Sequence, residues 1–104
     1  MRTYKESSEV IVTVRPVNTS GALFTPTNAR YRVDDLKSRN VLVALTTLTA
    51  STAMTITIPE SVNDIIDSTL DFEIKVVTIE IDHGTTSAHR DEYLYRVKNL
   101  HFVS

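Results

Sequence analysis

The chain has no cysteine, no tryptophan and only two glycines among its 104 residues. The missing cysteines exclude disulfide staples and thiolate metal sites. Gly21 and Gly84 alone supply neither a phosphate-binding loop nor a dinucleotide fingerprint, and no Gly-x-Ser-x-Gly elbow occurs. These absences remove the familiar sequence signatures of nucleotide-dependent and hydrolytic enzymes. We therefore expect a protein that is not an enzyme and that has no catalytic residues, cofactor or metal.

The sequence also lacks a strong net charge and a long apolar run. Its formal net charge is -2, which is too small and of the wrong sign for electrostatic capture of DNA or RNA. No apolar stretch approaches the roughly 20 residues that span a bilayer. The segment Met1–Glu6 has no apolar signal core, so export would need another route. We expect neither a nucleic-acid nor a membrane partner.

What the sequence does contain is alternation of apolar and polar residues, the pattern of strands with one buried face. Threonine, valine and isoleucine, which favour strands, are frequent. Turn signals recur roughly every ten residues, which is typical of a β-sandwich. The expected inward rows are Val10, Val12 and Val14; Ala29, Tyr31 and Val33; Met54, Ile56 and Ile58; and Tyr93, Tyr95 and Val97.

Two segments fit this alternation less well. Ala22 to Phe24 is expected to form a short strand that Pro26 ends, because proline cannot donate to a ladder. Val41 to Leu45 is a nearly continuous apolar run. Such a run predicts either a strand buried on both faces or a strand lying beside a partner.

The segment from Phe72 to Ile81 changes phase along its length. Phe72, Ile74 and Val76 form one apolar set, and the apolar positions after Val76 fall in the opposite phase. A β-bulge near Val76 and Val77 would explain the change. The alternative is a strand whose two halves present their apolar side chains to different faces.

Ser61 to Ile66 is the one segment expected to make a helical turn, with Ser61 as its cap and Asp64 three residues on. The remaining pattern predicts an all-β protein: an immunoglobulin-like antiparallel β-sandwich of about seven strands in a single domain, residues 1–104. A jelly roll or a small barrel would give similar alternation.

Three groups of polar residues could carry chemistry. His83, His89 and His101, with Asp82 and Asp91, match no metal-binding spacing, and we interpret the segment as a solvated hairpin loop. Four aspartates lack the calcium-loop pattern and are interpreted as turn formers; they are Asp34, Asp35, Asp64 and Asp67. Two tyrosine–arginine segments could form a stacking platform for single-stranded nucleic acid. Alternation places the tyrosines inward and the arginines outward, which opposes that hypothesis.

Several segments together resemble a known group of proteins. They are residues 25–35 (TPTNARYRVDD), 43–48 (VALTTL), 54–59 (MTITIP) followed by Asn63, and 73–79 with 93–100 (YLYRVKNL). In this order and spacing they are similar to small proteins of tailed bacteriophages and prophages that are encoded among virion structural genes. The resemblance extends from about Glu9 to Leu100. It implies an immunoglobulin-like fold, and it assigns no catalytic or ligand residue to this chain.

The resemblance implies a structural, non-enzymatic virion component: a head decoration protein, a neck or head–tail accessory, or a tail-attached protein. Its partners would be other virion proteins in many symmetric copies, and it would be assembled in the bacterial cytoplasm. The alternative is a carbohydrate- or cell-surface-binding module. The expected contacts lie on the Asp82–His89 turn and the Leu100–Ser104 tail, with candidate residues His83, Gly84, His89, Leu100, Phe102 and Val103.

Overall fold

A computed structural model describes residues 1–86 and 88–100 of the chain. The expectation of an all-β fold with one short helical turn is confirmed for these residues. The elements, in chain order, are β1 (Arg2–Lys5), β2 (Val10–Val14), β3 (Ala29–Asp35), β4 (Val41–Leu48), β5 (Met54–Ile58), the 3-10 turn η1 (Glu60–Asn63), β6 (Phe72–Ile81) and β7 (His89–Lys98).

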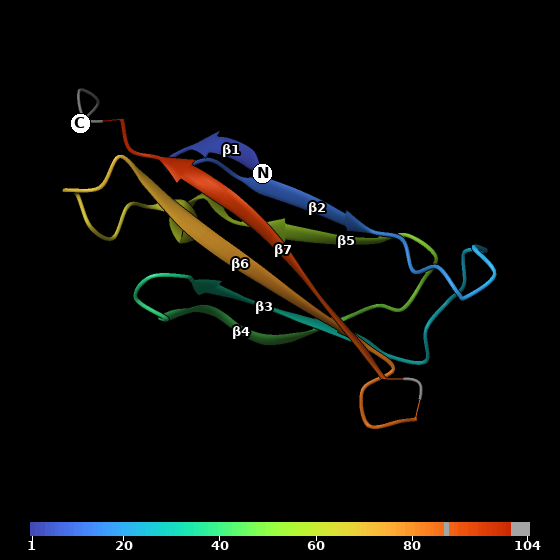
Figure 1. The fold of residues 1–104 in the computed structure, drawn as a ribbon. Helices are drawn as coiled ribbons and strands as arrows, with labels where there is room; N and C mark the ends of the chain where they lie inside the picture. The colour runs from blue at the N-terminus through green and yellow to red at the C-terminus, as the bar shows by residue number, and fades with distance from the viewer. Residues whose placement is uncertain (87, 101–104) are drawn as a thin grey trace.

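The strands form two sheets that lie one over the other (Figure 1). The larger sheet has the order β1-β7-β6-β3-β4, and the smaller sheet consists of β2 and β5. All pairs are antiparallel except β1 with β7. Those two strands lie at opposite ends of the chain, so no hairpin sets their relative direction. The expected sandwich is therefore present, with one parallel pair that the alternation did not predict.

The core lies between the two sheets and is built by the inward rows predicted from alternation. Val33 of β3 faces Val77 of β6 in the larger sheet, and neither side chain is exposed. In the smaller sheet, Val12 is paired with Ile56 across the β2–β5 ladder. The buried cluster as a whole comprises Val10, Val12, Val33, Ile56, Ile58, Val77, Ile79, Tyr95 and Val97.

The prediction of a β-bulge near Val76 and Val77 is wrong. Strand β6 keeps one unbroken register with both β3 and β7 along its length. The core face of β6 carries Glu73 and Lys75 at one end before the apolar residues begin. Its other face carries Phe72, Ile74 and Val76. The phase change therefore arises because the apolar side chains of the two halves lie on different faces, as the alternative interpretation proposed.

The segment Ala22–Phe24 is not a strand, contrary to expectation; Leu23 makes only an isolated bridge with Val17. The side chain of Asn18 explains the difference. Its Oδ1 accepts hydrogen bonds from the backbone N–H groups of Ser20 and Ala22 at 3.0 Å each. A local side-chain acceptor of this kind stabilises a turn in place of a ladder.

The helical turn is shorter than expected and begins earlier. It runs over Glu60–Asn63 and follows Pro59, with no side-chain cap, so the predicted role of Ser61 is wrong. Proline supplies a fixed φ at this position without any need for a hydroxyl cap. The turn ends at Asn63, which is fully buried.

Asn63 connects this turn to the sandwich through three hydrogen bonds. Its Nδ2 donates to the Ser8 carbonyl at 2.7 Å, and its Oδ1 accepts from the Tyr95 hydroxyl at 2.7 Å. Its own carbonyl accepts from the Ser7 N–H at 2.9 Å. Burial, mainly, raises the pKa of Tyr95 well above its usual range, so this hydroxyl stays a donor.

Substituting Tyr95 by phenylalanine is expected to lower the free energy of unfolding by about 1–3 kcal/mol, because Asn63 Oδ1 would be buried without a donor. The matched control is Tyr31→Phe, since Tyr31 is half-buried and makes no side-chain hydrogen bond with the described residues. Urea unfolding of the two variants measures the difference. Equal losses would show that the Tyr95–Asn63 bond contributes nothing.

Candidate functional site

The structure separates the predicted partner residues into two groups at opposite ends of the sandwich. His83, Gly84 and His89 lie at the end where the β6–β7 hairpin meets the β2–β3 and β4–β5 connections (Figure 1). Leu100 follows β7 at the other end, where its N–H donates to Glu6 Oε1 at 2.8 Å. Phe102 and Val103 lie outside the described residues. One partner contact spanning both groups would therefore have to extend along the whole sandwich.

The β6–β7 turn is anchored to the rest of the molecule. The Asp82 carboxylate accepts a hydrogen bond from the Thr27 N–H at 2.6 Å. Asn28 accepts from the His83 N–H at 2.8 Å and donates to the His83 carbonyl at 3.2 Å. Gly84 has a φ of 79°, a left-handed backbone conformation that glycine adopts readily. The turn therefore presents His83 and Gly84 on a fixed support.

The apolar run Val41–Leu45 lies at an open edge. It belongs to β4, the last strand of the larger sheet, so the expectation of burial on both faces is wrong. Val41 is 54% exposed and Leu45 is 46% exposed. Among the described residues no strand pairs with the second edge of β4. The eight residues VLVALTTL also contain no charge, proline or glycine, the features that usually protect a sheet edge.

Two irregularities interrupt the β3–β4 ladder, one between Tyr31 and Val33 and one between Val33 and Asp34. Such bulges twist a strand and are one of the ways by which proteins limit edge pairing. The regular part of β4 is its end, where Thr46, Thr47 and Leu48 pair in register with β3. The edge thus combines a short regular ladder with the exposed side chains of Val41 and Leu45.

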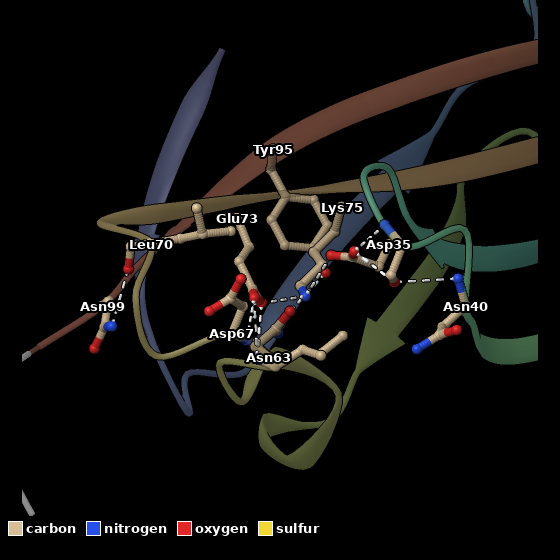
Figure 2. A network of polar contacts seen from close by, with 11 residues as sticks. Asp35, Asn40, Asn63, Asp67, Leu70, Glu73, Lys75, Tyr95 and Asn99 are labelled. Carbon is tan, nitrogen blue, oxygen red and sulfur yellow. Dashed lines mark hydrogen bonds and ion pairs between the residues drawn. The ribbon is translucent and has the colours of Figure 1, made fainter.

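A second feature, which the sequence interpretation missed, is a buried ionic cluster at one end of the core (Figure 2). The Lys75 ammonium, which is fully buried, lies 3.0 Å from Asp35 Oδ1 and 2.9 Å from Glu73 Oε1. Asp35 and Lys75 are directly opposite each other on β3 and β6. The Asp35 and Glu73 side chains are 5% and 4% exposed.

Backbone donors complete the cluster and connect it to two loops. Glu73 accepts hydrogen bonds from the N–H groups of Ile66 and Asp67, at 3.0 and 2.8 Å. Asp35 Oδ2 accepts from the Ser38 N–H at 2.9 Å and from its hydroxyl at 2.7 Å. Although burial opposes ionisation of Asp35, the bonds from Ser38 and Lys75 outweigh it and lower the pKa of that carboxyl.

The four aspartates lie in separate local structures. The interpretation as turn formers is confirmed for Asp35, which binds Ser38, and for Asp67, which accepts from the Thr69 hydroxyl at 2.6 Å. Asp34 pairs with Arg32. Asp64 accepts from the Ser7 hydroxyl. Within residues 1–86 and 88–100, no group of three or more histidine, cysteine, aspartate or glutamate side chains has an arrangement that could hold a metal ion.

The tyrosines and arginines lie on opposite faces of the larger sheet, as alternation predicted. Tyr95 is fully buried, and Tyr31 and Tyr93 pack against the core. Outside, Arg30 and Arg90 lie 2.8 and 3.1 Å from the two oxygens of Glu80. Arginines paired in this way are less available to phosphates, and inward tyrosines offer no stacking platform for bases or sugars.

Replacing Glu80 by glutamine is expected to reduce the loss in the free energy of unfolding that occurs as the pH falls below neutrality. The hydrogen bond from Arg30, aided by Arg90, lowers the pKa of Glu80 below its ordinary value of 4.5. When folding lowers the pKa of a carboxyl, the ionised carboxyl stabilises the fold at pH values above its pKa in the unfolded chain. This stabilisation is lost as the pH falls through the pKa of the carboxyl in the folded protein. Urea unfolding between about pH 7 and pH 3 should show a smaller loss for Glu80→Gln than for an exposed control, Glu9→Gln. The same slope in both variants would contradict the assignment.

Comparison with known proteins identifies no relative: no family model, curated protein or solved structure matches this chain. None of the helical residues in the described part of the chain forms a helix long and apolar enough to cross a membrane.

Proposed function

We propose that this protein is a structural, non-enzymatic component of a tailed-phage virion, acting through protein–protein contacts in a symmetric assembly. The observation that carries the proposal is the uncovered edge of β4. An uncharged strand with exposed apolar side chains at a sheet edge is a site for pairing with another chain, and isolated proteins normally block it. In an assembly, a neighbouring subunit would cover this edge.

The strand order supports an immunoglobulin-like topology for the sandwich. In variable-type immunoglobulin domains a sheet containing strands G, F, C and C′ faces a sheet containing B and E. Here β7, β6, β3 and β4 occur in the corresponding order, opposite the β2–β5 pair. This agreement is independent of the segments that resemble phage proteins, and it favours the same fold.

The proposed partners are other virion proteins of the head, neck or tail, joined in the host cytoplasm during particle assembly. No pocket chemistry is needed for this role. Edge β4 would supply the main contact, and the anchored turn around His83 and Gly84 would supply a second contact at one end of the sandwich.

Purified particles of the encoding phage test the proposal. The wild-type protein should co-purify with them at fixed stoichiometry. Replacing both Val41 and Leu45 by lysine should lower its incorporation about ten-fold or more, because two charges would be buried at the contact. The matched control is Ile11→Lys, which adds lysine at a position that is 56% exposed on the smaller sheet. A protein found only in the infected-cell lysate would contradict the proposal, as would normal incorporation of the double variant.

A further inference from the structure

The buried cluster brings together the three chemical groups that an amide-forming reaction needs. Lys75 supplies an amine, Asp35 supplies a carboxyl carbon, and Glu73 supplies a second carboxylate that contacts the amine nitrogen. All three residues are 5% exposed or less, so they lie in a water-poor environment. We propose that Lys75 and Asp35 join in an intramolecular isopeptide bond, with Glu73 as the proton carrier.

The nucleophile and the electrophile are held in place before any reaction. Lys75 Nζ lies 3.0 Å from Asp35 Oδ1, and the two residues are a directly opposed pair on neighbouring strands. Burial removes the rotational freedom that an exposed lysine would have. Holding two reacting groups in contact turns a slow bimolecular condensation into a unimolecular step with a high effective concentration.

Ser38 provides the donors that the tetrahedral intermediate requires. Its N–H and its hydroxyl both donate to Asp35 Oδ2, at 2.9 and 2.7 Å. When the amine attacks the Asp35 carboxyl carbon, negative charge develops on one carboxyl oxygen. The two Ser38 donors would stabilise that charge on Oδ2, which becomes the amide oxygen. Oδ1, on the lysine side, is then the oxygen that leaves.

The proton balance closes with the residues that are present. The resting pair is an ammonium and a carboxylate, so one proton must first move from Lys75 Nζ to Asp35 Oδ1, which gives a neutral amine and a neutral carboxylic acid. Glu73 Oε1, at 2.9 Å from Nζ, carries this proton, and after the amine has attacked it carries a second proton from Nζ to the leaving oxygen. The amide nitrogen keeps one hydrogen, and the other two leave with Oδ1 as one water molecule. No oxidant, metal or second substrate is consumed.

Burial also favours the product. An ammonium and a carboxylate cost free energy when they are removed from water, whereas an amide is neutral. Asp35 and Glu73 also border a surface groove that is lined by Leu36, Leu70 and Phe72. The bond would join β3 to β6 covalently across the centre of the larger sheet. A domain linked in this way would withstand heat and mechanical load, whatever assembly it belongs to.

Mass spectrometry of the intact, purified chain tests the proposal directly. The wild-type protein should weigh one water molecule less than its sequence requires, and a tryptic digest should contain a branched peptide joining the Asp35 and Lys75 segments. Lys75→Arg should have its full sequence mass, because a guanidinium is a poor nucleophile. Glu73→Gln should slow the conversion at least ten-fold in freshly purified protein.

The outcome does not depend on the virion proposal, because the recombinant chain alone is sufficient. A wild-type protein that keeps its full sequence mass after prolonged incubation, with unmodified Asp35 and Lys75 peptides, would overturn the isopeptide bond. Conversion at the wild-type rate in Glu73→Gln would overturn the role of Glu73. Because folding of Lys75→Arg is not required for reading the wild-type mass, a misfolded variant would not obscure the result.

Discussion

Replacing Lys75 by methionine is expected to lower the free energy of unfolding by at least about 3–5 kcal/mol, because Asp35 and Glu73 would be left as buried carboxylates without their cation. The measurement is urea unfolding at neutral pH, with Lys5→Met on the exposed strand β1 as the control.

A second substitution separates the buried charges from the packing of the lysine stem. Combining Lys75→Met with Asp35→Asn should lower the free energy of unfolding by less than the sum of the two single losses. Each single variant leaves one member of the ion pair buried without its partner, whereas the double variant removes both members. Additive effects of the two substitutions would contradict a direct interaction. A loss for Lys75→Met no larger than that for Lys5→Met would contradict the cluster's contribution to stability.

Replacing Ile56 by alanine is expected to destabilise the protein by about 2–5 kcal/mol, since it removes a fully buried side chain from the layer between the sheets. Ile11→Ala is the matched control, because Ile11 lies on the neighbouring strand of the same sheet and is 56% exposed. Thermal or urea unfolding of the two variants compares the two faces of the β2–β5 sheet. Equal losses would show that the smaller sheet does not pack through the Ile56 face.

The core could be predicted because its residues follow one simple rule. Val33, Ile56 and Val97 each alternate with polar neighbours, and each of them is buried. The β1 strand was not predicted because its four residues contain a single apolar side chain of any size, Tyr4, and gain their structure from pairing with β7. Short edge strands of this kind depend on tertiary contacts and carry little local signal.

The sequence interpretation missed the buried cluster because it followed the apolar set Phe72, Ile74 and Val76 in this part of β6 and treated Asp35 as a turn former. Glu73 and Lys75 are in phase with Val77 and Ile79, so an uninterrupted period of two residues would have placed all four on the core face. Asp35 is likewise in phase with Val33. A charged residue that continues an inward apolar row towards the end of a strand is therefore a signal for a buried ion pair.

The exposed edge β4 illustrates a different limit. Its apolar composition predicted a buried strand or a partnered one, and sequence alone could not separate the two. The structure excludes burial within the described chain, because Val41 and Leu45 are about half exposed. The partnered interpretation remains, and it now rests on a physical argument: an unprotected apolar edge is a liability unless another chain covers it.

The proposed virion role is tested most directly by a reconstruction of purified particles of a phage that carries the gene for this chain. We expect density for this domain in symmetric copies, with the β4 edge and the side chains of Val41 and Leu45 covered by a neighbouring subunit. The absence of the domain from the particle would contradict the proposed role. A domain present in the particle with β4 open to solvent in every copy would contradict the proposed contact.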